Sequence, residues 1–187
     1  MIITLAGHHG AGKSTLSKGL VAHYGLKAYS AGGMMRELAM ERGVSLLDLG
    51  RDAERDGGEI DKLLDARSVE LGQTHDKFII DGRLAFHFIP HSFKIFLTVP
   101  PEEAAKRIYH DETRAGIESH VSIEDTIQNI RTRRESENLR YREYYGLDIY
   151  DMSHYDLVID TTGLKISDVL QRTIEAIEHR KQHHPIM

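Results

Sequence analysis

One segment near the start of the sequence has residues that could bind phosphate. It matches the pattern G-x-x-x-x-G-K-[S/T], and it reads Gly7-His8-His9-Gly10-Ala11-Gly12-Lys13-Ser14. Glycines let the backbone turn its N–H groups inward around phosphate oxygens. We expect the ammonium group of Lys13 to reach the β- and γ-phosphates and the hydroxyl of Ser14 to ligate Mg²⁺. The segment therefore predicts a site for a nucleoside triphosphate and magnesium, extending from Gly7 to Thr15.

The residues on both sides of this loop are those that a phosphate site needs. Ile2–Ala6 is a short apolar run that predicts a buried strand, and an amphipathic helix follows the loop. Such a helix directs the positive end of its dipole at a bound phosphate. The alternative is a glycine-rich turn before an ordinary helix, but the four fixed positions match by chance in roughly one chain in a hundred of this length.

Two histidines occupy variable positions of the loop, where the backbone does most of the binding. We interpret His8 and His9 as tolerated side chains, and contact of either one with the nucleotide stays an open alternative. The chain has 12 histidines in all. No metal-ligand spacing repeats among them, so we expect the others to be surface residues.

A carboxylate stands at the end of a second apolar run. Phe78–Ile80 predicts another buried strand, and Asp81 follows it directly. In a chain with a phosphate loop, this placement predicts that Asp81 binds Mg²⁺ through a water molecule. The alternative, an acidic residue with no function at a strand end, is the weaker interpretation.

Several arginines could neutralise a transferring phosphoryl group. Three of them follow predicted strands at short distances: Arg36, Arg83 and Arg107. Arg133, Glu137 and Arg140 are spaced i, i+4, i+7 and so share one helix face. Phosphoryl transfer depends on positioning and charge neutralisation, which converging guanidinium groups provide. Any one of these arginines, taken alone, is better explained as an exposed surface residue.

The elements that must position these residues alternate along the chain. Five apolar strands are predicted, at 2–6, 27–30, 78–80, 94–99 and 155–159. Helices between them imply a parallel sheet that is covered on both faces. The last helix is expected to bury a stripe made of Ile166, Val169, Leu170, Ile174 and Ile177. The polar helical stretches 31–74 and 114–145 are predicted to be mobile segments over a site at the strand ends.

Length and composition limit the classes of protein that fit. A chain of 187 residues suits one domain, with 40% hydrophobic and 28% charged residues. The net charge of −5 disfavours a nucleic-acid partner, and no apolar run is long enough to cross a membrane. The absence of cysteine and of a signal-peptide pattern fits a cytoplasmic protein. We expect a monomer or a weak homodimer.

Later segments make the chain resemble the nucleoside monophosphate kinases, and most closely the short archaeal-type cytidylate kinases. The markers, beside the phosphate loop, are Ser-Ala-Gly-Gly-Met-Met-Arg-Glu (30–37), Asp-Gly-Arg-Leu-Ala (81–85), Arg-Arg-Glu-Ser-Glu-Asn-Leu-Arg-Tyr (133–141), Tyr-Gly-Leu-Asp (145–148) and Tyr-Asp-Leu-Val-Ile-Asp-Thr (155–161). The resemblance implies a three-layer P-loop NTPase fold of the α/β class. It also implies the strand order 2-3-1-4-5 and one kinase domain over residues 1–187. Within it, 31–74 would bind the monophosphate and 114–145 would be the lid.

The same resemblance implies a role for each selected side chain. Arg36 and Arg83 would hold the acceptor monophosphate, and Arg107 would lie over the adenine of ATP. Arg133 and Arg140 would come from the lid, with Arg133 on the transferring phosphoryl group. Glu137 would stand near the acceptor nucleoside. Lys13, Asp81, Arg83 and Arg133 together would be the catalytic set.

The implied reaction is the transfer of a phosphoryl group from MgATP to a small nucleotide, CMP or dCMP. Leu84 stands where the larger bacterial cytidylate kinases have an aspartate that reads cytosine. Asp81-Gly82-Arg83 differs from the Asp-Gly-Phe-Pro-Arg run of adenylate kinases, which disfavours AMP as the acceptor. Two alternatives stay open: a kinase for UMP, AMP or a small metabolite, and a nucleotide-binding module without catalysis.

Overall fold

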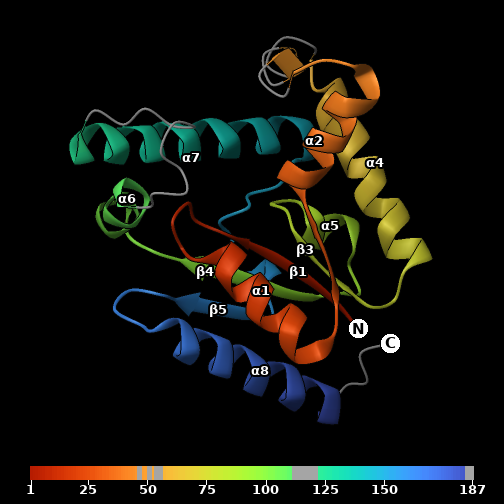
Figure 1. The fold of residues 1–187 in the computed structure, drawn as a ribbon, viewed down its shortest axis with the longest axis vertical. Helices are drawn as coiled ribbons and strands as arrows, with labels where there is room; N and C mark the ends of the chain where they lie inside the picture. The colour runs from red at the N-terminus through yellow and green to blue at the C-terminus, as the bar shows by residue number, and fades with distance from the viewer. Residues whose placement is uncertain (46–47, 50–51, 53–56, 111–121, 184–187) are drawn as a thin grey trace.

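The molecule is built around one parallel sheet of five strands (Figure 1). The computed structural model describes residues 1–45, 48–49, 52, 57–110 and 122–183. Its strands are β1 (Ile2–Gly7), β2 (Lys27–Ser30), β3 (Phe78–Asp81), β4 (Phe93–Thr98) and β5 (Leu157–Asp160). They lie in the order β2-β3-β1-β4-β5 and all pairs are parallel, which confirms the predicted fold and strand order.

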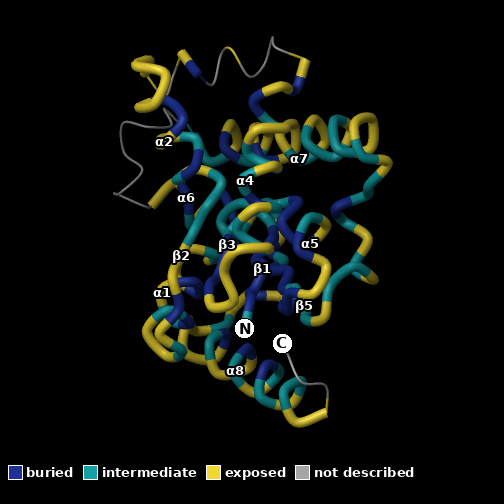
Figure 2. The backbone as a smooth tube through the Cα atoms, turned by 90° about the vertical axis from the view of Figure 1, so that its right-hand side faces the viewer, coloured by how far each residue is buried: buried dark blue, intermediate teal, exposed yellow. Residues whose placement is uncertain are grey.

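Alternate residues of the strands enter two different apolar cores. Ile3 and Leu5 of β1 pack in one core, where the long helices α1 (Lys13–Tyr24) and α8 (Ile166–His183) supply Leu16, Leu20 and Ile177 among others. Ile2 packs in the other core, together with Phe78 and Ile80 of β3. Because successive side chains of a strand point to opposite faces, the sheet is the middle of three layers. The three central strands, β3, β1 and β4, are largely buried, whereas the edge strands β2 and β5 are more exposed (Figure 2).

The second face of the sheet is covered by α2 (Ala31–Arg42), α4 (Glu59–Thr74) and the short α5 (Ala85–Phe88). Met34 of α2 and Ala85 of α5 pack on Phe78 and Ile80. Two further helices, α6 (Pro101–Tyr109) and α7 (Ile123–Tyr145), pack against each other. In Figure 1, α7 crosses beyond one end of the sheet, with α2 and α4 beside it.

The strand ends that face α7 carry the polar residues. Ser30 of β2 lies in register with Asp81 of β3, Asp81 with Leu5 of β1, and Thr98 of β4 with Asp160 of β5. In a parallel sheet all carboxyl ends meet at one edge, so residues far apart in sequence are brought to a common site there.

Glycines interrupt the helical segments where expected, whereas two short elements were not predicted. Glycines interrupt the region 31–74 as expected: Gly43 caps α2 and Gly58 precedes α4, both with positive φ. Residues 46–47, 50–51 and 53–56 of this region, and 114–121 of the lid segment, lie outside the described residues. Two short elements were not predicted, α5 and the 3₁₀ helix η2 (Met152–His154), because pieces of three or four residues have no periodicity to detect.

The predicted stripe of the last helix is wrong at one position. Val169 and Ile177 are buried, but Ile166 is 64% exposed. It is the first residue of α8, where the helix leaves the sheet edge. Within the described residues, no helix is both long and apolar enough to cross a bilayer.

Candidate active site

The loop between β1 and α1 is shaped by three glycines with positive φ. They are Gly7 (φ 143°), Gly10 (φ 73°) and Gly12 (φ 89°). A Cβ atom at Gly7 would lie 2.4 Å from the carbonyl oxygen of Leu97 in β4, and one at Gly10 would lie 2.9 Å from that of Ala104 in α6. Only glycine therefore allows the loop to pass this close to both elements. Gly12 then caps the N-terminus of α1, whose dipole attracts anions.

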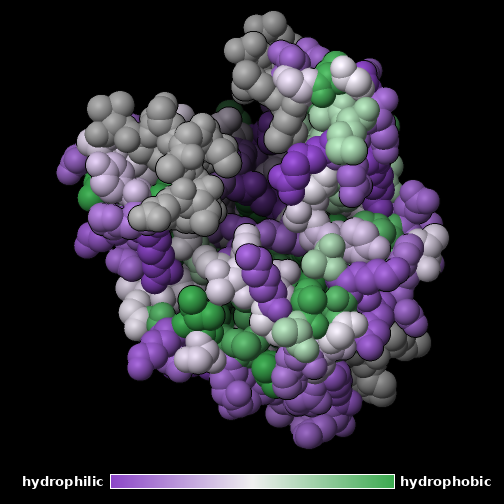
Figure 3. Space-filling model, viewed as in Figure 1, coloured by the Kyte–Doolittle hydropathy of each residue, from purple (hydrophilic) through white to green (hydrophobic). Residues whose placement is uncertain are grey.

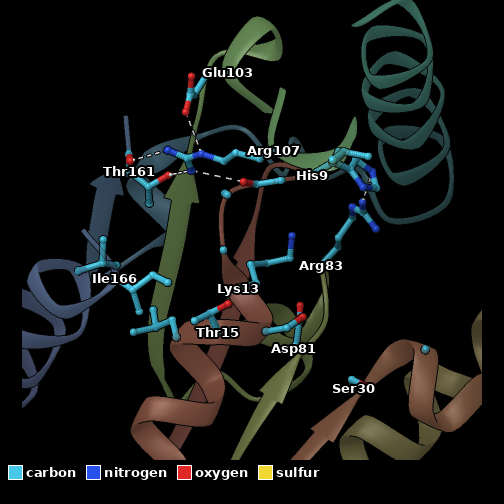
Figure 4. A pocket seen from close by; sticks show the side chains of 18 of the residues that line it. His9, Lys13, Thr15, Ser30, Asp81, Arg83, Glu103, Arg107, Thr161 and Ile166 are labelled. Carbon is cyan, nitrogen blue, oxygen red and sulfur yellow. Dashed lines mark hydrogen bonds and ion pairs between the residues drawn. The ribbon is translucent and has the colours of Figure 1, made fainter. Parts of the chain in front are cut away.

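A cleft of about 910 Å³ opens beside this loop. It is lined by residues 9–16 of the loop and helix, by the carboxyl ends of β2 and β3, and by parts of α6 and the β5–α8 segment (Figure 4). In the space-filling view the same face is hollowed, with hydrophilic walls between α7 and the side formed by α2 and α4 (Figure 3). Polar side chains from five separate segments therefore share one concave space.

The ammonium group of Lys13 lies over the loop at the centre of this cleft. Its Nζ donates hydrogen bonds to the carbonyl oxygens of Gly7, at 3.0 Å, and His8, at 2.9 Å. Ser14 and Thr15 follow it in the lining. Burial raises the pKa of the nearby Asp81 carboxyl, while the charges of Lys13 and Arg83 act in the opposite direction. The structure thus brings the predicted phosphate-binding lysine and the predicted metal-site carboxylate together.

The oxygen atoms here fit a magnesium ion. Ser14 offers a hydroxyl and Asp81 a carboxylate, the hard ligands that Mg²⁺ prefers. Among residues 1–45, 48–49, 52, 57–110 and 122–183, no group of three or more His, Cys, Asp or Glu side chains forms a metal cage. A site of this type suits an ion that takes its other ligands from substrate phosphates and water.

Two arginines line one side of the cleft. Arg36 lies in α2, whose N-terminus is capped by Ser30: the Oγ atom of Ser30 accepts a 3.0 Å hydrogen bond from the N–H of Gly33. Arg83 follows β3, and its Nε lies 2.8 Å from Oε2 of Glu137 in an ion pair. These two guanidinium groups are candidates for binding a second anion beside the loop.

Arg107 lies on the other side of the cleft, on α6. Its guanidinium donates hydrogen bonds to Thr161 Oγ1 (3.0 Å) and Thr161 O (2.9 Å), and its Nε donates to Glu103 Oε1 (3.0 Å). The apolar lining next to it comes from Ile108, Leu164, Ile166 and Val169. A fixed cationic plane beside apolar side chains is suited to a nucleotide base.

The remaining arginines of the predicted set do not line this cleft. Arg140 pairs with Asp61 of α4 at 3.6 Å. Arg133 lies close enough to Glu137 for its charge to lower the pKa of that carboxyl. Their neighbour Arg134, which was not selected, donates to Val99 O at 3.1 Å. The predicted face of α7 thus contacts α4 through Arg140 and the loop side of the cleft through Glu137, and Arg134 beside this face contacts the end of β4.

Sequence reasoning missed several lining residues on the Arg107 side. Thr161, Gly163 and Leu164 belong to the turn between β5 and α8, and Ile166 is the first residue of α8. The Asp-Thr-Thr-Gly run at 160–163 was a detectable signal, because it follows a strand at the same sheet edge as the loop.

The two loop histidines have different surroundings. Nδ1 of His8 lies 2.9 Å from Val99 O and 3.1 Å from Val99 N, and its ring contacts the rings of Phe96 and Tyr150. Burial is the main reason that its pKa falls to about 4, with Lys13 and Arg134 also lowering it. His8 is therefore neutral at pH 7 and connects the loop to β4, whereas His9 lines the cleft.

Comparison with known proteins gives a consistent result. A family model described as the cytidylate kinase-like family matches residues 2–163. A protein named cytidylate kinase from Methanococcoides burtonii is 38% identical over 179 residues, which is 94% of this chain and 98% of that protein. Another of the same name, from Methanothrix thermoacetophila, is 42% identical over 161 residues, or 86% of this chain and 88% of the relative.

Solved structures share the fold. A shikimate kinase from Bacteroides thetaiotaomicron superposes with a TM-score of 0.69 at 17% identity, covering 95% of this chain and 98% of that one. A shikimate kinase from Aquifex aeolicus gives 0.59 at 18% identity, covering 99% of both chains. At this identity the likeness establishes the architecture and leaves the acceptor undetermined.

Proposed function

The chain belongs to the cytidylate kinase-like family, and on that premise we propose that it transfers the γ-phosphoryl group of ATP to CMP or dCMP. The observation that best supports this reaction is the placement of Lys13 between two cationic sides of one cleft, with Arg107 on one and Arg83 on the other (Figure 4). A hydrolase needs one phosphate site, whereas a kinase needs two that meet.

The donor side is assigned to ATP. Backbone N–H groups of the loop and the N-terminus of α1 would hold the β- and γ-phosphates, with Lys13 neutralising them. Arg107 would lie over the adenine, against the apolar residues of the β5–α8 turn. Ser14 and, through water, Asp81 would hold Mg²⁺, which supplies further charge neutralisation when bound.

The acceptor side is assigned to the monophosphate. Arg36 and Arg83 would bind its phosphate, and Glu137 would stand near the nucleoside. One oxygen of that phosphate attacks the γ-phosphorus, a new P–O bond forms, and the bond to the β-phosphate oxygen breaks to leave ADP. The attacking oxygen is already anionic at neutral pH, so no general base is required. The side chains act by position and charge.

Closure of the cleft would keep water from the γ-phosphate. The segment 31–74 is assigned to the acceptor and the segment 114–145 to the lid, with Arg133 on the transferring group and Arg140 beside it. In the structure described above, Arg140 pairs with Asp61 of the acceptor segment, so α7 and α4 already meet. Closure would shorten the distance between Arg133 and the γ-phosphate.

A panel of acceptors tests the proposal. ADP formation from ATP is measured with CMP, dCMP, UMP, AMP and shikimate, using Lys13→Ala as the inactive control. We expect kcat/KM for CMP or dCMP to exceed the values for the other acceptors by at least about tenfold, since a lost hydrogen bond to the base costs this much. A higher kcat/KM for UMP, AMP or shikimate would show that this compound, rather than CMP or dCMP, is the acceptor. ATP binding without transfer to any acceptor would leave only a nucleotide-binding module.

A further inference from the structure

His9 is the loop residue whose role the reaction above does not explain. Its side chain is 15% exposed and points from the phosphate loop toward Arg83 (Figure 4). The Nε2 atom of His9 lies 2.6 Å from Nη2 of Arg83 and 3.6 Å from Oε1 of Glu137. Arg83 also pairs with Glu137, so three side chains from three segments form one connected group.

This group joins the donor site to the acceptor site. His9 belongs to the loop that encloses the donor phosphates, and Arg83 follows β3 on the acceptor side. Without a hydrogen-bond acceptor at position 9, Glu137 would be the one remaining side chain among the described residues that holds Arg83. Since an arginine side chain has several rotatable bonds, one contact does not fix the plane of its guanidinium.

We propose that His9 is a positioning residue that orients the Arg83 guanidinium toward the acceptor phosphate. This inference rests on the proposed function, which assigns Arg83 to that phosphate. The Nε side of Arg83 forms an ion pair with Glu137, and Nε2 of His9 accepts one Nη2 hydrogen. Both Nη1 hydrogens and the second Nη2 hydrogen then stay available for the two oxygens of a phosphate.

The role requires a neutral imidazole, because Nε2 must accept a hydrogen bond. The groups that face the ring are Arg83, Glu137 and Arg133, with His8 next to it in the loop. The carboxylate of Glu137 raises the pKa of His9, but burial and the charges of Arg83 and Arg133 outweigh it, so the pKa lies below its ordinary value of 6.5. His9 is thus neutral at pH 7.

Protonation would exchange the partners of His9. An imidazolium Nε2–H would donate to Oε1 of Glu137 and repel the guanidinium of Arg83. Arg83 would lose one of its two holding contacts. Binding of the acceptor should therefore weaken as the pH falls through the lowered pKa of His9, while binding of ATP to the loop backbone should change little.

The experiment compares four proteins: the parent, His9→Ala, His9→Gln and the control His8→Asn. The amide oxygen of Gln can accept the Arg83 hydrogen bond but does not titrate. His8 belongs to the same loop and contacts β4 rather than Arg83. For each protein, KM is measured for CMP and for ATP at pH 7.5, and the KM for CMP is followed from pH 7.5 to 5.5.

We expect His9→Ala to raise the KM for CMP about tenfold and to change the KM for ATP less than twofold. The KM for CMP of His9→Gln should stay within about threefold of the parent value at pH 7.5. In His8→Asn, the KM for CMP and the KM for ATP should change by the same factor. As the pH falls toward 5.5, the KM for CMP should rise more in the parent than in His9→Gln. The phosphate of CMP also gains a proton near pH 6, but it does so equally with every variant.

Three results would overturn the inference: equal changes in both KM values, no change in either, or a His9→Gln variant as impaired as His9→Ala. If His9→Ala fails to fold, the pH comparison between the parent and His9→Gln still tests the inference. A KM for CMP that rises equally in both proteins would overturn it. A parent that phosphorylates no monophosphate would instead overturn the proposed function, and the inference with it. An active parent with an unaffected His9→Ala variant would overturn the inference alone.

Discussion

In the proposed reaction, Lys13 is the side chain on which binding of the transferring phosphoryl group depends most directly. Its Nζ already lies within hydrogen-bonding distance of two loop carbonyl oxygens, at the position where phosphate oxygens would replace them. Lys13→Ala should lower kcat/KM at least about 100-fold, equivalent to about 3 kcal/mol of transition-state stabilisation. Steady-state kinetics with CMP and ATP measure this loss. An activity within about threefold of the parent would show that Lys13 does not have this role.

The burial of His8 leads us to predict that the free energy of unfolding depends on pH. Burial lowers the pKa of the folded side chain to about 4, from 6.5, so the unfolded chain binds the proton first as the pH falls. The contribution of His8 to the free energy of unfolding should therefore be fully present above pH 6.5 and fall by about 1 to 2 kcal/mol toward pH 4, after allowance for residual solvent exposure. Urea unfolding at pH 7.5 and 5.0 tests this.

His8→Asn is the matched control for that titration. Its amide can keep the contact with Val99, and it has no proton to bind in this range. The loss of stability between pH 7.5 and 5.0 should be smaller in this variant than in the parent. An identical loss in both proteins would assign the pH dependence to other groups.

At the scale of elements, the stability of the loop between β1 and α1 depends on how closely its backbone approaches the neighbouring strand and helix. Gly7 and Gly12 both have positive φ, but a Cβ at Gly7 would lie 2.4 Å from the Leu97 carbonyl, whereas one at Gly12 would meet no atom within 4 Å. Gly7→Ala should lower the free energy of unfolding by about 3 to 5 kcal/mol, from clash and strain together.

Gly12→Ala is the matched comparison, because it adds only backbone strain. We expect it to cost about 1 to 2 kcal/mol. Thermal unfolding of both variants separates the two effects. Equal destabilisation by the two substitutions would mean that the close approach of β1 to β4 does not add to the cost of a side chain at Gly7.

The long helix α7 shows how far pattern and spacing can locate a site. The spacing of Arg133, Glu137 and Arg140 predicts a common face, and Glu137 does contact Arg83. Spacing could not predict that Arg140 would turn to Asp61 of α4, because that contact depends on how two helices pack after folding. The same limit explains why the contact of His9 with Arg83 was not predicted.

Other parts of the site follow from local chemistry and were predictable. The loop sequence specifies its own turn, and the apolar run before Asp81 places that carboxylate at the sheet edge. The turn at 160–163 was missed because it contributes to the site through its position beside Arg107. That position depends on how the chain folds. Local sequence thus determines the phosphate loop, and tertiary packing determines which cations surround it.

At the scale of the whole molecule, the sheet places the proposed donor and acceptor sites on a single edge. The central strand β1 ends in the phosphate loop, and β2 and β3 end at Ser30 and Asp81 on the acceptor side. The β5–α8 turn and Arg107 of α6 lie on the donor side. In the proposed reaction, the strand order therefore separates the two ligands across β1, and the phosphoryl group would cross the loop between them.

The ratio of products tests the central claim most directly. The enzyme is incubated with equal amounts of ATP and CMP, and ADP, CDP and free phosphate are separated and quantified. If two anion sites meet across the phosphate loop, one CDP forms for each ADP and little free phosphate is released. ADP that appears together with free phosphate, at a rate that CMP does not change, would contradict a site built to transfer the phosphoryl group between nucleotides.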